Sequence, residues 1–103
     1  MKKSSLILIV SLFLTSAAWA QRSLPMDVLE AAQRGDQEAQ LEMGILYEFG
    51  FFMPGHTIPA LAWYMRSAEQ GNQKAIKRRD LLISGMNQGE IDQAQSQSSQ
   101  QVR

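Results

Sequence analysis

The sequence predicts an all-α protein, and three observations support this class. Between residues 26 and 86, β-branched residues are sparse, and no segment alternates apolar and polar residues with the period of two that is typical of strands. Apolar residues recur there at helical spacing, and Gly followed by Asp or Asn separates successive apolar segments as a helix stop and cap. The same stretch also resembles itself at a fixed offset, as helical repeats do. We therefore expect a short α/α solenoid of about four antiparallel helices.

The first two predicted helices follow from their caps. We expect a short helix that is capped by Asp27 and runs to Arg34, and a helix over 37–49 that is capped by Asp36. Between them stands a glycine, residue 35, which suits the left-handed conformation at a helix C-terminus. The second helix contains Gly44, which costs about 1 kcal/mol relative to Ala. A neighbouring helix that approaches closely at this point would explain the glycine.

The third and fourth helices are predicted over 59–70 and 73–86. Pro59 suits the first turn of the third helix, because the N–H that proline lacks would be unpaired there. Asn72 is the expected cap of the fourth helix. On the third helix, the apolar stripe is Leu61, Tyr64, Met65 and Ala68, and the polar side is Ala62, Arg66 and Glu69. On the fourth, Lys74, Lys77, Arg78, Arg79 and Asp80 are expected to face outward.

Residues 1–20 have the features of a cleavable signal peptide. Two lysines precede an apolar core over residues 6–14. Ala18 and Ala20 are the small residues that signal peptidase requires, so we expect cleavage after Ala20. The apolar stretch up to that site is shorter than the roughly 20 residues that span a bilayer. We therefore predict a periplasmic or secreted bacterial protein with no integral membrane span after cleavage.

The rest of the chain divides into three parts. Residues 21–25 form a lead-in, and residues 26–86 form the helical domain. Residues 87–103 are rich in Gln and Ser, with only Ile91 and Val102 as sizeable apolar residues. Such a segment buries too little surface to offset its ordering entropy, so we expect a disordered tail.

Composition excludes several kinds of function. The chain has 10 basic and 10 acidic residues, and loss of the two leader lysines leaves eight against ten. A nucleic-acid binder would need a basic excess. The absence of cysteine rules out disulfides, thiolate metal sites and a cysteine nucleophile. The single histidine, His56, has no nucleophile or carboxylate close to it in sequence. We predict no enzyme activity, no cofactor and no metal site.

An internal repeat appears when the sequence is compared with itself at an offset of 36 residues, which places residue 35 on residue 71. It superposes Ala32 on Ala68, Gly35 on Gly71, Asp36 on Asn72, Gln37 on Gln73, Ala39 on Ala75 and Leu46 on Leu82. The helix stop, the cap and a small packing residue therefore recur in register. A period in the mid-thirties is typical of helical solenoids.

These residues resemble the Sel-1-like repeat, a branch of the tetratricopeptide-like solenoids. The resemblance covers residues 28–86 and is carried by Ala32, Gly35, Ala39, Gly44, Tyr47, Gly50, Ala60, Trp63, Tyr64, Ala68, Gly71 and Ala75. It implies one full repeat flanked by half-repeats. Phe52, His56 and Pro59 depart from the family pattern and make the loop at 50–57 more apolar than usual.

The resemblance implies an interaction scaffold. We expect a non-enzymatic adaptor or regulator in the bacterial cell envelope that binds another envelope or secreted protein and no nucleic acid. Self-association is a further expectation, because so short an array has a small core. The alternatives are an immunity-type inhibitor of a secreted toxin and, among enzymes, an envelope hydrolase. The expected contact residues are Tyr47, Phe51, Phe52, Met53 and Tyr64, while Phe49 is expected in the core.

Overall fold

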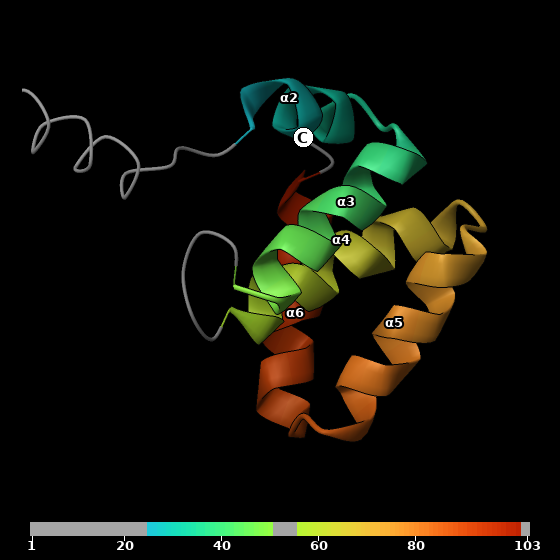
Figure 1. Ribbon diagram of the computed structural model, residues 1–103. Helices are drawn as coiled ribbons and strands as arrows, with labels where there is room; N and C mark the ends of the chain where they lie inside the picture. The colour runs from blue at the N-terminus through green and yellow to red at the C-terminus, as the bar shows by residue number, and fades with distance from the viewer. Residues whose placement is uncertain (1–24, 51–55, 102–103) are drawn as a thin grey trace, which may run out of the picture.

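The computed structural model describes residues 25–50 and 56–101. This part of the chain is all-helical, and its helices are α2 (Met26–Gln33), α3 (Gln37–Glu48), α4 (Thr57–Glu69), α5 (Gln73–Ser84) and α6 (Gln88–Gln101) (Figure 1). The predicted all-α class is therefore confirmed here, with five helices where about four were expected. None of these helices is long and apolar enough to cross a membrane. The predicted signal peptide, with Ala18 and Ala20, lies outside the described residues.

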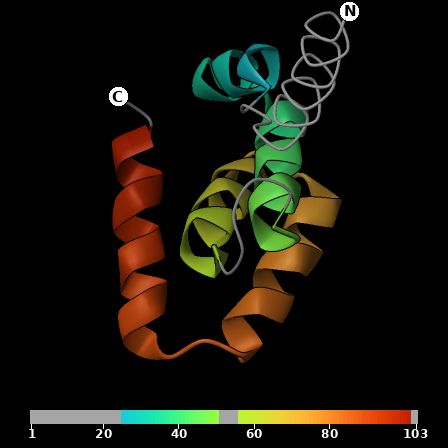
Figure 2. The same ribbon diagram turned by 60° about the vertical axis from the view of Figure 1, so that its left-hand side comes forward.

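Helix α4 is the centre of the fold. It packs against α3, α5 and α6, and Figure 2 shows it between α5 and α6. Residues 60–68 are all buried, so the helix is covered on every side. The polar side that the sequence predicts for α4 is therefore wrong at Ala62 and Arg66, which are buried, and only Glu69 is exposed. A helix that is buried all round needs small residues as well as large ones, and α4 supplies alanines for this purpose.

Three apolar clusters fill the spaces around α4. Between α3, α4 and α5 lie Leu41, Ala60, Tyr64, Ala68 and Ala75. Between α2, α3 and α4 lie Ala32, Ala39, Met43 and Trp63. Between α4 and α6 lie Leu61, Met65 and Ala94, with Leu82, Ile83 and Met86 packed against them from α5 and the segment after it.

Close approach of α3 and α4 explains Gly44, as the sequence predicts. A methyl carbon at Gly44 would lie 2.5 Å from Tyr64 Cδ1 and 3.0 Å from Tyr64 Cγ. Real Cβ atoms essentially never come closer than 3.0 Å to such a neighbour. The aromatic ring therefore rests directly on the backbone of α3, and glycine is the residue that leaves room for it.

The helix boundaries follow local chemistry. Gly35 and Gly71 have φ values of 105° and 91°, the left-handed conformation expected of a helix stop. The Asp36 carboxylate accepts hydrogen bonds from the backbone N–H groups of Glu38 and Ala39, at 2.9 and 3.1 Å. Asn72 caps α5 in the same way. The Asp27 cap is wrong: α2 already begins at Met26, Asp27 lies within its first turn, and the N-cap residue is Pro25, with no side-chain cap.

Helix α6 lies where the sequence predicts a disordered tail. Asn87 and Glu90 form a reciprocal capping box: the Glu90 N–H donates to Asn87 Oδ1 and the Asn87 N–H donates to Glu90 Oε1. Ala94 and Ser98 are buried on the face of α6 that packs against α4. Small side chains at this spacing let two helices approach closely, so the segment packs without many large apolar residues. The prediction of a disordered tail is therefore wrong for residues 88–101, because it rested on the low apolar content of the segment alone.

Candidate protein-interaction surface

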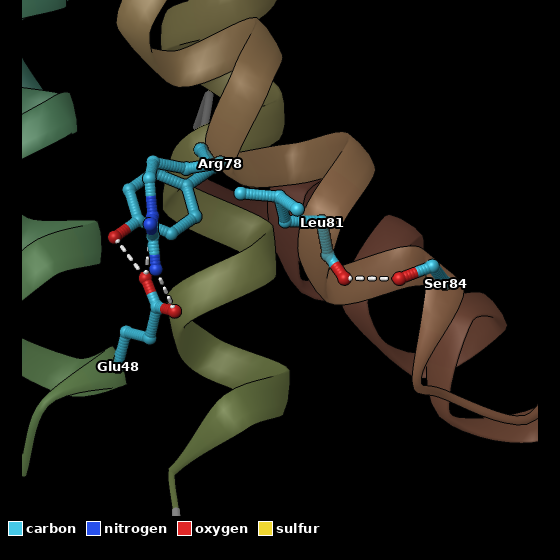
Figure 3. A network of polar contacts seen from close by, with 5 residues as sticks. Glu48, Arg78, Leu81 and Ser84 are labelled. Atoms are coloured by element: carbon cyan, nitrogen blue, oxygen red, sulfur yellow. Dashed lines mark hydrogen bonds and ion pairs between the residues drawn. The ribbon is translucent and has the colours of Figure 1, made fainter.

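A polar network joins α3, α4 and α5 at the C-terminal end of α3 (Figure 3). The Tyr64 hydroxyl donates to Glu48 Oε1 over 2.7 Å. Arg78 Nε donates to the same oxygen over 3.1 Å, and Arg78 Nη2 pairs with Glu48 Oε2. The Glu48 carboxylate thus accepts from two helices at once, and its side chain is mostly buried. The network holds Arg78 in one orientation.

The network shifts two pKa values. Burial, and then the adjacent Glu48 carboxylate, raise the pKa of the Tyr64 phenol well above its ordinary value. The hydrogen bond to Glu48 raises the pKa of Arg78. Tyr64 is therefore a neutral donor and Arg78 a fixed cation near neutral pH. This arrangement suits a structural anchor, because neither group is available to exchange a proton.

Exposed apolar side chains lie near the fixed guanidinium. Phe49 follows α3 directly and is 60% exposed, and Leu81 on α5 is also 60% exposed. The guanidinium carbon of Arg78 lies 5.2 Å from the centroid of the Phe49 ring. Arg78 and Leu81 project from successive turns of α5 to the same side (Figure 3). We call Phe49, Arg78 and Leu81 the Phe49–Leu81 surface.

The predicted contact residues differ in how far they are exposed to solvent. Tyr47 is half-buried, and its ring centroid lies 6.3 Å from that of His56 with the planes inclined at 55°. Tyr64 is completely buried, so its prediction as a contact residue is wrong. It packs on Gly44 and donates to Glu48 instead. The remaining predicted contacts, residues 51–53, lie outside the described residues.

Sequence reasoning missed the residues that form this surface. Phe49 was expected in the core, but it extends past the end of α3 into solvent. Arg78 was expected as one of several outward charges, with no sign of its pairing to Glu48. Leu81 carries a detectable signal, because three successive apolar residues, 81–83, are each turned by about 100° on a helix and cannot all face inward.

The described residues offer no group of three or more His, Asp or Glu side chains that would hold a metal ion. His56 contacts the Tyr47 ring and precedes α4. Comparison of the chain with protein-family models, with curated proteins and with solved structures finds no match.

Proposed function

We propose that this chain is an exported helical-repeat module that binds another protein of the bacterial envelope without catalysing a reaction. The observation that carries the proposal is the Phe49–Leu81 surface. Two large apolar side chains stand in solvent beside a guanidinium whose orientation Glu48 fixes. Exposed aromatic and Arg side chains that are already held in place bind partners at low entropic cost.

The repeat supports a Sel-1-like solenoid as the scaffold of this surface. Residues one repeat apart have the same role: Gly35 and Gly71 end helices with positive φ, and Asp36 and Asn72 cap the helices that follow. After α2, the described helices follow in the order α3, α4, α5 and α6, and both α5 and α6 pack on α4. In the proposed solenoid, α3 with α4 is one unit and α5 with α6 the next. We propose that α3 and α5 are equivalent first helices of these units and carry the binding face.

The test compares two matched variants of the mature chain. Phe49→Ser combined with Leu81→Ser removes the apolar part of the surface. Met26→Ser is the control, and it removes one large apolar side chain, 57% exposed, from α2. Each protein captures partners from an envelope extract, after circular dichroism shows equal helicity. We expect wild type and Met26→Ser to retain the same stoichiometric protein and the double variant to lose it.

Two results would contradict the proposal. Equal retention by all three proteins would show that the partner does not bind at the Phe49–Leu81 surface. Retention of nothing above background by wild type would remove the support for a protein partner. Export is tested separately, by sequencing the N-terminus of the protein from the envelope fraction. Our proposal requires Gln21 as the first residue, and a chain that starts at Met1 in the cytoplasmic fraction would contradict it.

A further inference from the structure

Helix α6 is attached to the fold differently from the other helices. Polar contacts tie α2, α3, α4 and α5 together: Gln40 Nε2 donates to the Ala32 carbonyl, Gln70 to Gln40, and Ser67 to the Gln37 carbonyl. Asn72 donates to Glu38, and Arg78 to Glu48. Among the described residues, every hydrogen bond of an α6 side chain stays within α6 or reaches Asn87 beside it. In the described part of the chain, packing and the short connection to α5 hold α6 in place.

Helix α6 contributes few and mostly small side chains to its contact with α4 and α5. The helix contributes Ala94 and the half-buried Ile91 to the apolar cluster, and Ser98 is its other buried residue. On the opposite side, α4 and α5 contribute Leu61, Met65 and several aliphatic side chains. Large apolar side chains are thus covered by a helix with few of its own, so α6 gains little burial energy at this site.

The space beside α6 is also incompletely filled. A cleft of about 550 Å³ is bordered by Met65 and Glu69 of α4, Arg79 and Ile83 of α5, and Gln95, Ser98 and Ser99 of α6. Helix α6 packs on α4, and α5 and α6 are not a major packing pair, consistent with their separation in Figure 2. The side chains of α6 that border the cleft are polar, and Ile83 of α5 is only half-buried there.

We propose that α6 is a displaceable cover, and that the groove beneath it on α4 and α5 accepts an amphipathic helix from a partner protein. This helix carries large aliphatic side chains at the three positions that Ile91, Ala94 and Ser98 occupy, a spacing of i, i+3 and i+7. The groove already holds a helix, and larger side chains would fill the cleft that α6 leaves. The recognition mode is a helix in a groove. The groove and the Phe49–Leu81 surface lie on different faces of α5.

The first test uses the unmodified chain and hydrogen exchange. If α6 opens alone, its amides exchange faster than those of α4, through a local opening that is less sensitive to denaturant than global unfolding. Equal protection of α4 and α6, with the same denaturant dependence, would show one cooperative unit and overturn the proposal.

The second test measures binding of a defined probe. The probe is a fluorescent peptide of residues 87–101 that carries Ala94→Leu and Ser98→Leu, so it keeps the capping box and adds the aliphatic face. In the full chain, Ala94→Asp introduces a carboxylate at a completely buried position and releases α6. Gln93→Asp makes the same change in charge at an exposed position of α6 and is the matched control.

We expect Ala94→Asp to bind the peptide at least about tenfold more tightly than wild type, because apparent affinity falls with the fraction of molecules whose groove is open. Gln93→Asp is expected to match wild type. No binding to Ala94→Asp while α3–α5 keep their helicity would overturn the proposal. Loss of α3–α5 in this variant would also overturn it, because α6 would then be part of the indivisible core. Neither outcome affects the Phe49–Leu81 proposal, which a separate pair of variants tests.

Discussion

Substitution of Gly44 by alanine tests how closely α3 and α4 pack. The added methyl would lie 2.5 Å from Tyr64 Cδ1, so the ring has to move. Tyr64 is completely buried, and its hydroxyl donates to Glu48, which Arg78 also holds. The ring therefore cannot move without weakening this hydrogen bond or displacing its neighbours.

The expected change in the free energy of unfolding is the sum of three effects. Alanine in place of glycine stabilises a helix interior by about 1 kcal/mol. Overpacking of a filled core costs about 1–3 kcal/mol. A weakened hydrogen bond to a charged acceptor adds about 1–2 kcal/mol. The packing effects exceed the helix effect, so we expect Gly44→Ala to lower the free energy of unfolding by about 2 kcal/mol. For a domain of this size, that lowers Tm by roughly 8–16 °C.

The assay is thermal unfolding followed by circular dichroism, with Gly89→Ala as the matched control. Gly89 is in a helix, and its added methyl would make only an ordinary 3.4 Å contact with Asn87 Oδ1. We expect the control to melt at or slightly above wild type. A double-mutant cycle with Tyr64→Leu should give less destabilisation than the sum of the two single changes. A Tm for Gly44→Ala at or above that of wild type would refute the reasoning.

Three further predictions concern single groups. Because burial and the Glu48 carboxylate raise the pKa of Tyr64, the folded state holds the phenolic proton more tightly than the unfolded state. Stability should therefore fall as pH rises above the ordinary tyrosine pKa near 10, and Tyr64→Phe should reduce this fall in urea unfolding at alkaline pH. Arg66 is only 8% exposed, and its buried Nη1 has no hydrogen-bond partner among the described residues, so Arg66→Met should raise the free energy of unfolding by about 1–2 kcal/mol while Arg66→Lys gives no gain. Asp36→Ala removes two capping hydrogen bonds and should cost about 1–2 kcal/mol, measured against Glu42→Ala at an exposed position of the same helix.

The turns were predictable because their chemistry is local. A glycine followed by Asp36 or Asn72 specifies a helix stop and a cap within a few residues, and the structure has both. The need for Gly44 was also predictable, since a glycine inside a helix has a cost that a close neighbour explains. The identity of that neighbour, Tyr64, depends on the register between two helices, which sequence spacing alone does not give.

Helix α6 was missed because apolar content was the wrong measure for it. Its stability as a helix is signalled by the Asn87 and Glu90 capping box, and its packing by Ala94 and Ser98, which are small. The buried amide of Gln40 was missed for a related reason. Its Nε2 donates to the Ala32 carbonyl and its Oε1 accepts from Gln70, so its partners come from two other segments. Neither partner is near it in sequence.

The interaction surface was the least predictable part, since exposure is decided by what the fold leaves uncovered. Phe49 is a large apolar residue of the kind that fills protein cores, yet it lies beyond the last turn of α3, where none of the described helices covers it. Arg78 reaches it from α5, a distant part of the sequence. Tyr64 shows the opposite case: its place in the apolar stripe of α4 predicted burial, and that placement contradicts its selection as a contact residue.

The two proposed binding regions differ in how binding energy would be used. At the Phe49–Leu81 surface, Glu48 holds Arg78 before any partner arrives, so little ordering cost remains and affinity depends on the apolar contacts. At the α4–α5 groove, a partner helix has to replace α6, so part of its binding energy is spent in opening the groove. A partner of the first region should therefore bind at a rate that is independent of α6 opening. A partner of the second should bind at a rate that rises when Ala94→Asp opens the groove, and this contrast separates the two regions even if one protein contacts both.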